Sequence, residues 1–180
     1  MELLTDRLLL RPLQAGDLVH LQRYAVREAF FRFLPIDKQT SQDVEKFLSD
    51  RLAEQDKGVA DRLTFAIEPL DEGHIIGTVR IEIQDKVYRQ GDLGFAMDLE
   101  HQGKGYMTEA VRSVLSTGFE HLELHRIWAT ADTENERSWR LMERVGMTRE
   151  GLLRQDTLNC GQWRDSYLYA ILASDGIEEN

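Results

Sequence analysis

The fold is decided by the segment Leu99-Glu100-His101-Gln102-Gly103-Lys104-Gly105-Tyr106-Met107-Thr108, because strand patterns precede it and a helical pattern follows it. The glycines at positions 103 and 105 have no Cβ, so the backbone can turn tightly and point several N–H groups into one concavity. From Met107 onward, apolar residues recur with the period of a helix, at Ala110, Val111, Val114, Leu115, Gly118 and Phe119. A helix N-terminus offers unpaired N–H groups and the positive end of the helix dipole, so the segment predicts an anion site suited to phosphate.

Two familiar phosphate-binding motifs do not fit this segment. A P-loop needs a longer glycine spacing that ends in Lys-Ser or Lys-Thr, whereas Tyr106 follows Gly105 here. A dinucleotide fingerprint needs a third glycine where Thr108 stands and an acidic residue about twenty positions later. The order of the surrounding elements must therefore identify the site.

Composition predicts a single domain. The chain has 180 residues, of which 42% are hydrophobic, enough for one core and too few for two. We expect the domain to span residues 1–174 and the acidic tail at 175–180 to be frayed. Cys160 is the single cysteine, so no intramolecular disulfide can form, and the residue is more naturally incidental than nucleophilic.

The charge of the chain limits its partners. Asp and Glu outnumber Lys and Arg by 32 to 22, which gives a formal net charge of -10. Such a surface repels nucleic acid and anionic membranes and favours a cationic amine or basic peptide, although it can equally serve solubility alone. The N-terminus lacks a signal-peptide pattern and no stretch is long and apolar enough to span a membrane, so we expect a cytoplasmic protein.

Upstream of the glycine segment, hydrophobic periodicity predicts a strand, two helices and three more strands. The expected ranges are a strand at 7–11 that Pro12 ends or places at an edge, helices at 18–25 and from 40 or 41 onward, and strands at 63–67, 77–83 and 92–97. An aromatic segment at 30–35 fits neither period and more naturally fills the core than lines a substrate site. Short turns join the last three strands, which predicts an antiparallel meander.

Downstream, the pattern predicts a long helix to about His121, a strand at 125–131, a helix from about Glu134 and a closing hairpin. The hairpin strands are expected at 152–158 and 163–173. Because a long helix separates the strands at 92–97 and 125–131, they can lie parallel with a right-handed crossover. This order excludes a doubly wound nucleotide-binding fold.

The glycine segment resembles the pyrophosphate loop of the GNAT acetyltransferases, Gln/Arg-x-x-Gly-x-Gly/Ala, with Glu100 in place of Gln or Arg. The wording Gly-Lys-Gly-Tyr-Met-Thr-Glu-Ala is similar to the RimJ/RimL-type branch, which acetylates protein N-termini and small amines. Further similarities to that branch are Thr5-Asp6-Arg7-Leu8-Leu9-Leu10-Arg11, Asn135-Glu136-Arg137-Ser138, Val145-Gly146-Met147 in place of its usual Gly-Phe, and Gly161-Gln162-Trp163-Arg164-Asp165 with Tyr167 and Tyr169. The resemblance covers nearly the whole chain.

The resemblance implies an α+β fold in which a mixed, mostly antiparallel sheet contains a splayed parallel strand pair and is flanked by about four helices. It further implies acetyl-coenzyme A as co-substrate, with the pantetheine arm inserted between the splayed strands like an added strand. The implied cofactor contacts are the backbone of Gly94, Phe95, Ala96 and Met97, the amides of Gln102, Gly103, Lys104, Gly105, Tyr106 and Met107, and the side chains of Asn135 and Ser138. His101, His121 and His125 have no metal-ligand spacing, so no metal is expected.

The implied chemistry is direct acetyl transfer to a neutral amine without an acyl-enzyme. It needs a proton donor for the leaving thiolate and a route for the amine proton. The tyrosine that many GNAT enzymes use as general acid is replaced by Met142, so Ser138 becomes the candidate acid. Asp156 is the candidate base, with its pKa raised near a dry thioester; the alternatives are Asp92, Glu82, Asp165 and water.

We therefore expect an acetyl-coenzyme A dependent N-acetyltransferase whose acceptor is a protein N-terminal Ser or Ala or a small cationic amine. An alternative is a catalytically idle acyl-coenzyme A sensor or scaffold of the same fold, which the residues Glu100 and Met142 favour. A nucleic-acid-binding module would need a basic face that the composition disfavours. The closing hairpin makes a homodimer reasonable.

Overall fold

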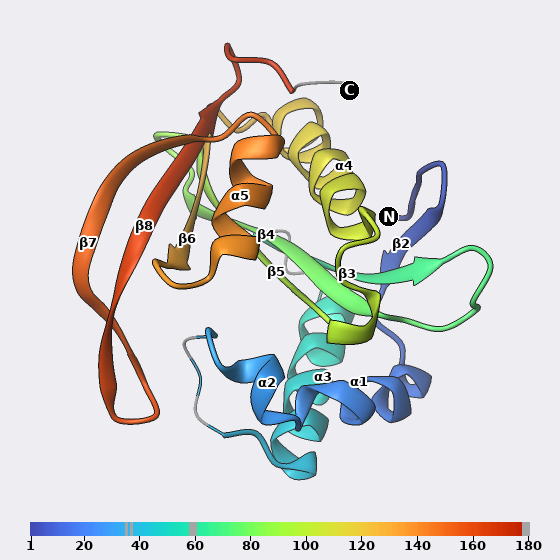
Figure 1. The fold of residues 1–180 in the computed structure, drawn as a ribbon. Helices are drawn as coiled ribbons and strands as arrows, with labels where there is room; N and C mark the ends of the chain where they lie inside the picture. Colours follow the sequence, from blue (N-terminus) through green and yellow to red (C-terminus); the bar gives the residue numbers. More distant parts are fainter. Residues whose placement is uncertain (35, 37, 58–60, 178–180) are drawn as a thin grey trace.

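The computed structural model describes residues 1–34, 36, 38–57 and 61–177, and these form an eight-stranded sheet flanked by helices (Figure 1). The strands are β1 (Leu3–Leu4), β2 (Leu8–Pro12), β3 (Arg62–Pro69), β4 (Gly77–Asp85), β5 (Gln90–Met97), β6 (Arg126–Asp132), β7 (Thr148–Asn159) and β8 (Gln162–Leu172). The helices are α1 (Leu18–Ala25), α2 (Glu28–Phe31), α3 (Ser41–Asp56), α4 (Tyr106–Glu120) and α5 (Glu136–Arg144), with single 3-10 turns at η1 (Ala15–Asp17) and η2 (Leu99–His101). The mixed α+β fold predicted from the sequence is confirmed.

Two short elements have no counterpart in the predicted order. β1 is two residues long and pairs with Leu9 and Leu10, and so short a stretch shows no periodicity. α2 is a four-residue helix whose last two residues begin the aromatic segment, so the described residues form five α-helices rather than about four. Phe31 is buried and Phe30 packs against Tyr24, as expected for residues that fill the core. Pro35 of that segment and residues 178–180 of the predicted tail lie outside the described residues.

The sheet has the strand order β1-β2-β3-β4-β5-β6-β8-β7, and its single parallel contact is between β5 and β6. That contact is brief: it joins Gln90 to Arg126, Gly91 to Ile127 and Asp92 to Trp128, and then ends. β6 continues to pair with β8 as far as Asp132, and β5 continues to pair with β4 as far as Met97. The two parallel strands therefore splay apart, and the edge of β5 over residues 93–97 faces an opening in the middle of the sheet.

Helices cover the two faces of the sheet and bury a separate core on each. β3 shows the division, because Phe65 and Ile67 pack into the core under α4 and α5, whereas Ala66 between them packs against α1 and α3. In Figure 1 the blue to cyan helices α1 to α3 accordingly lie together below the sheet, and the yellow and orange helices α4 and α5 lie above it. No helix in the described ranges is long and apolar enough to cross a membrane.

The sequence supplies a recognisable signal at several element boundaries. Thr40 is the N-cap of α3: its hydroxyl accepts the N–H of Asp43, and the Asp43 carboxylate accepts the N–H of Thr40. The β7–β8 turn has positive φ at both Cys160 (47°) and Gly161 (77°), the backbone that a two-residue hairpin turn needs. Cys160 is thus an exposed residue of the turn expected between the closing hairpin strands.

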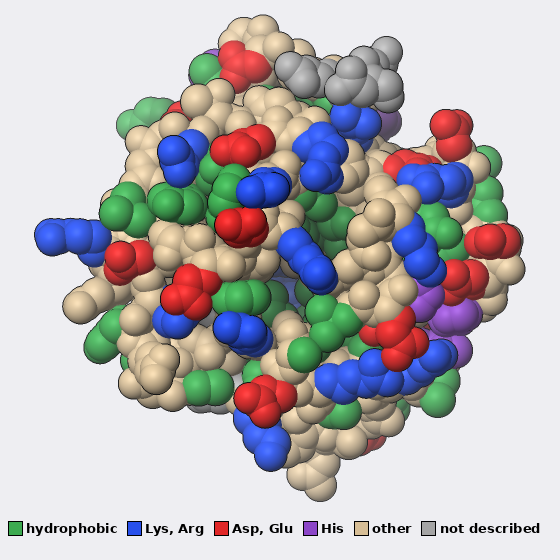
Figure 2. Space-filling view, in the orientation of Figure 1, with side chains coloured by type: hydrophobic (Ala, Val, Ile, Leu, Met, Phe, Trp, Pro, Cys, Tyr) green, Lys and Arg blue, Asp and Glu red, His purple; other side chains and the backbone are tan. Residues whose placement is uncertain are grey.

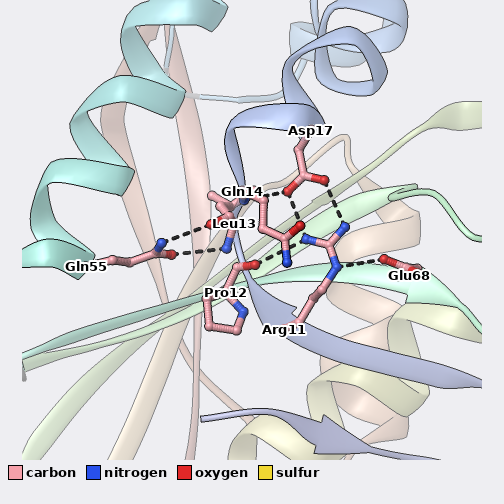
Figure 3. Close-up of polar contacts among 7 residues, drawn as sticks. All are labelled: Arg11, Pro12, Leu13, Gln14, Asp17, Gln55 and Glu68. Atoms are coloured by element: carbon pink, nitrogen blue, oxygen red, sulfur yellow. Dashed lines mark hydrogen bonds and ion pairs between the residues drawn. The ribbon is translucent and has the colours of Figure 1, made fainter.

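A buried ion pair ties β2 to the helical layer below the sheet (Figure 3). The guanidinium of Arg11 donates two hydrogen bonds to the carboxylate of Asp17, at 2.9 and 2.8 Å, and a third to Glu68 on β3 at 2.7 Å. Asp17 is 4% exposed, and it also accepts the N–H of Gln14 at 2.7 Å. These bonds set the direction in which the chain leaves the sheet to form α1.

A second contact holds α3 to the same place. The side-chain amide of Gln55 accepts the N–H of Leu13 at 3.1 Å and donates to the carbonyl of Leu13 at 3.0 Å (Figure 3). Leu13 is itself buried. The start of α1 and the end of α3 are therefore both anchored to β2 and to the residues that follow it.

We expect Asp17→Asn to lower the free energy of unfolding by about 3 kcal/mol, because the buried Arg11 guanidinium loses the carboxylate that accepts two of its hydrogen bonds and keeps only Glu68 as a charged partner. Urea denaturation measures the change. The matched control is Asp50→Asn, which removes the carboxylate from the exposed Lys46–Asp50 pair on α3 and is expected to change stability by less than about 0.5 kcal/mol. Equal effects of the two substitutions would contradict the anchoring role of Asp17.

Candidate active site

The loop between η2 and α4 presents backbone amides at the start of a helix. Gly103 and Gly105 have φ angles of 81° and 85°, which residues with a side chain rarely adopt. Gly105 is the N-cap of α4, so no side chain caps the first turn of this helix. The N–H groups of Tyr106, Met107 and Thr108 are consequently free of a side-chain cap and are positioned to bind an anion.

The turn between β1 and β2 contacts the start of α4 through Thr5 and Arg7. The Arg7 guanidinium donates to Glu109 on α4 at 2.7 Å and to the carbonyl of Lys104 at 3.0 Å, and it lies 4.9 Å from the centre of the Tyr106 ring. Glu109 also accepts the Thr5 hydroxyl at 2.6 Å and the backbone N–H of Arg7 at 2.9 Å. Side chains from the turn between β1 and β2 thereby stabilise the loop.

The carboxylate of Glu109 has a perturbed pKa. Burial raises the pKa, but the hydrogen bonds from the Thr5 hydroxyl and from the Arg7 backbone and guanidinium outweigh burial and hold the pKa below its ordinary value. Glu109 is therefore ionised at neutral pH.

Gln102 connects the loop to both sides of the opening. Its side chain donates to the carbonyl of Met97 at the end of β5, at 3.3 Å, and accepts a hydrogen bond from Arg137 in the first turn of α5, at 2.8 Å. Arg137 was not a candidate from the sequence, because only the fold shows that it reaches across to the loop. This contact adds a positive charge next to the free amides of α4.

Glu100, the departure from the family pattern, points away from the loop amides. Its carboxylate accepts a hydrogen bond from Arg27 at 2.9 Å and lies 3.5 Å from Arg23, so it connects η2 to the α1–α2 layer. The hydrogen bond from Arg27 lowers the pKa of Glu100. The negative charge of Glu100 is therefore paired with arginine side chains.

The opening in the sheet is lined by the remaining candidate cofactor residues. On β5, Phe95 and Ala96 are half-buried and Met97 is buried, and these residues pair with β4 on one side only. On the far side, Asn135 is the N-cap of α5, and its side-chain oxygen accepts the N–H of Ser138 at 3.3 Å. The capping role uses the oxygen of Asn135 and leaves its NH₂ group available.

The same face of the molecule has a central hollow with hydrophobic side chains inside it and Lys and Arg side chains around it (Figure 2).

Ser138 is half-buried one turn into α5, and Met142 lies one turn further and is 1% exposed. Met142 packs in the core under α4 and α5, so it fills space and offers no proton. Ser138 has a hydroxyl at the half-buried start of the helix.

The carboxylates considered as bases differ in their surroundings. Glu82 and Asp92 form ion pairs with Arg80, and Asp165 accepts the N–H of Gln155. Asp156 is exposed and has no ion pair or hydrogen bond within the described part of the chain, whereas the resemblance implies a dry environment. It lies in the irregular part of β7 between Leu153 and Thr157, close to the level at which β6 ends and α5 begins.

A cavity of about 350 Å³ opens between the α1–α2 layer and the β7–β8 turn, lined by Val26, Glu28, Phe31, Lys38 and Cys160. The turn is fixed to this layer because the side-chain NH₂ of Asn159 donates to the carbonyls of Leu34 at 2.5 Å and Phe31 at 3.3 Å. Glu28 places a negative charge at the cavity wall.

Comparison with known proteins assigns the family. Residues 7–148, well over half of the chain, match the Acetyltransferase (GNAT) domain. The chain belongs to the GNAT acetyltransferase family. Enzymes of this family use acetyl-coenzyme A, and the resemblance to the RimJ/RimL-type branch is confirmed by relatives and structural neighbours with ribosomal-protein acetyltransferase names.

Three relatives illustrate the similarity, and two of them are named for their acceptors. The chain is 29% identical over 177 residues to the uncharacterized N-acetyltransferase YnaD of Bacillus subtilis, covering 97% of this chain and 99% of YnaD. It is 26% identical over 171 residues to the spermidine N(1)-acetyltransferase of Escherichia coli, covering 95% and 89%. It is 32% identical over 112 residues to the Escherichia coli [ribosomal protein uS5]-alanine N-acetyltransferase, covering 62% and 58%.

Solved structures agree with the fold of this GNAT enzyme. A GNAT-family acetyltransferase from Bacillus anthracis superposes with a TM-score of 0.86 at 27% identity and covers 97% of this chain and 99% of its own. Mycobacterium smegmatis RimJ in complex with CoA-disulfide superposes with a TM-score of 0.79 at 28% identity and covers 93% and 82%. The order of elements and the parallel strand pair are thus those of the family.

We expect Glu109→Gln to lower the free energy of unfolding at pH 7 by about 1–2 kcal/mol, because the charge-assisted bonds from Arg7 are lost. The folded-state pKa of Glu109 is depressed, so its stabilising contribution is fully present above the unfolded value of about 4.3 and is lost as the pH falls through the folded-state pKa. The stability difference between wild type and variant should therefore shrink as the pH falls from 5 to 3 in urea titrations.

The control is Glu136→Gln, which removes one partner of the exposed Glu136–Arg140 pair and should change stability by less than about 0.5 kcal/mol. A difference between wild type and Glu109→Gln that stays constant across this pH range would show that the carboxylate charge does not hold the loop.

Proposed function

We propose that this GNAT enzyme transfers the acetyl group of acetyl-coenzyme A directly to a primary amine, without an acyl-enzyme. The observation that carries the proposal is the combination of an open β5 edge with a loop of free helix-terminal amides at its end. The open β5 edge fits an extended chain that contains amides, which is the pantetheine arm of coenzyme A. The free amides of the loop fit a pyrophosphate, which coenzyme A also carries.

In this proposal the backbone of Phe95, Ala96 and Met97 binds the amides of the pantetheine arm as a neighbouring strand would. The pyrophosphate binds the amides of the loop, which are those of Gln102, Gly103, Lys104, Gly105, Tyr106 and Met107. Lys104 and Arg137 add positive charge, and the free NH₂ of Asn135 donates to the cofactor from the opposite side.

Ser138 is the proposed general acid. As the thioester carbon accepts the amine, the thiolate leaves and needs a proton. The Ser138 hydroxyl, one turn into α5, can hydrogen-bond the sulfur and relay a proton to it, and the hydroxyl regains its own proton from the acetylated ammonium group or from water. The apolar, buried Met142 leaves Ser138 as the proton donor on this face of α5. The exposed position of Asp156 favours its acting on the incoming ammonium ion, directly or through water, over a role inside the thioester site.

The proposed acceptor is a protein N-terminal Ser or Ala or a small cationic amine. Relatives named for spermidine and for the alanine of uS5 support both classes. The net charge of -10 favours an acceptor that approaches as a cation.

A second candidate is a coenzyme A binding module without turnover. It is favoured by the replacement of the usual tyrosine by the buried Met142. It predicts saturable cofactor binding with no transfer to any amine, whereas the transferase requires the release of free thiol.

The test is release of coenzyme A thiol from acetyl-coenzyme A in the presence of Ser- or Ala-starting peptides, spermidine or free amino acids. We expect amine-dependent release with one acceptor class. With that acceptor, Ser138→Ala should lower kcat by about 10²-fold while the affinity for coenzyme A changes less than about threefold, because the lost proton donation matters in the transition state.

The control is Ser116→Ala on α4, where the serine hydroxyl donates a hydrogen bond to Glu120. This variant should leave kcat and the affinity for coenzyme A unchanged. Equal losses of kcat and cofactor affinity in Ser138→Ala would remove Ser138 from the acid role. Tight coenzyme A binding with no release from any acceptor would favour the module without turnover.

A further inference from the structure

Three side chains with metal-ligating atoms converge on the side of η2 that faces the β3–β4 turn. Nε2 of His101 lies 3.0 Å from Oε2 of Glu72, and Nε2 of His74 lies 3.3 Å from the same oxygen. One ligand atom from each residue lies within 4.8 Å of the other two. His101 is buried, and the other two are half-buried. Figure 2 shows histidine side chains gathered beside acidic ones at the right of the view.

The sequence hides this cluster because its members come from two segments. Glu72 and His101 are 29 positions apart, and His101, His121 and His125 have no metal-ligand spacing. The long β4–β5 hairpin returns the chain so that η2 lies against the turn before β4, where the N–H of Asp98 bonds the carbonyl of Ile76 at 2.8 Å. The antiparallel pairing of β3, β4 and β5 therefore brings the three side chains together.

Both imidazole rings are oriented as metal-bound histidines are. Nδ1 of His74 lies 3.1 Å from the backbone carbonyl of Glu72, which can only accept, so the proton sits on Nδ1 and a neutral ring keeps its lone pair on Nε2. Nδ1 of His101 faces the buried carboxylate of Asp98 at 3.6 Å. A backbone carbonyl and a carboxylate behind the ligating rings are the usual outer partners of metal-binding histidines.

No Lys or Arg side chain pairs with the carboxylates of this cluster in the described part of the chain. The two carboxylates are those of Glu72 and Asp98. Nδ1 of His101 is buried and has no hydrogen-bond partner among these residues. A divalent cation bound to Nε2 would balance the two carboxylates and polarise Nδ1–H toward Asp98.

The distances and the donor set select the cation. In a tetrahedral zinc site with bonds of about 2.0–2.1 Å, ligand atoms are about 3.3 Å apart, close to the separations of 3.0 and 3.3 Å from Glu72. Two imidazoles and one carboxylate suit zinc and neighbouring transition metals, whereas calcium and magnesium prefer all-oxygen ligands.

We propose that Glu72, His74 and His101 form a zinc-class metal site that connects the β3–β4 turn to η2, the element directly before the amide loop. The ligands are Oε2 of Glu72 and Nε2 of each histidine, and water completes the coordination. The bound metal stabilises the start of the loop and takes no part in acetyl transfer, so the proposal stands apart from the proposed activity.

The test uses tag-free protein that has been stripped with a chelator and titrated with zinc chloride by calorimetry, and with cobalt(II) by visible absorption. We expect about one equivalent per chain, a cobalt spectrum typical of tetrahedral coordination, and a rise in Tm with zinc but not with magnesium or calcium. Glu72→Gln and His74→Gln should each weaken zinc binding by at least about tenfold and abolish the Tm rise.

His121→Gln, at an exposed histidine outside the cluster, is the matched control and should bind zinc like the wild type. Because Glu72 and His74 are only half-buried, their variants should fold without metal, which circular dichroism checks. Absence of stoichiometric zinc binding to the wild type, or affinity that Glu72→Gln and His74→Gln leave unchanged, would overturn the site. None of these readouts involves acetyl transfer.

Discussion

The parting of β5 from β6 is the constraint on which the rest of the structure depends. After Asp92 and Trp128 the parallel ladder stops, and β5 continues with one edge unpaired over residues 93–97. Backbone donors and acceptors left inside a protein need partners, so this opening is suited to an extended, amide-containing ligand. β8 keeps β6 in place on the other side, and α4 and α5 both begin beside the opening, so their N-termini face the same space.

Local charge at the opening differs from the charge of the whole chain. The net charge is -10, but Arg7, Lys104 and Arg137 surround the amide loop, and nearby acids are held in pairs. Glu109 is occupied by Arg7 and Thr5, and Glu100 by Arg27. The phosphate-binding end can therefore be positive while the remaining surface attracts a cationic acceptor.

Sequence periodicity was sufficient for the meander, the long α4 and the closing hairpin, because each has a sustained pattern. β1 and α2 have two and four residues, too few to show a period. Within the site, the glycine spacing was enough to predict the amide loop. The contacts of Gln102 with Arg137 and of His101 with Glu72 join segments that are distant in the sequence, so no local pattern predicts them. The environment of Asp156 also depends on tertiary structure, and its exposure differs from the dry surroundings implied by resemblance.

Hydrogen exchange measured with and without coenzyme A tests most directly whether the cofactor fills the opening. The account predicts slower amide exchange in peptides covering residues 93–97 and 102–107 when coenzyme A is bound, because both stretches gain hydrogen-bond partners. Peptides covering residues 129–132 of β6, which already pair with β8, should change much less. Saturating binding of coenzyme A that leaves exchange at residues 93–97 unchanged would contradict the account.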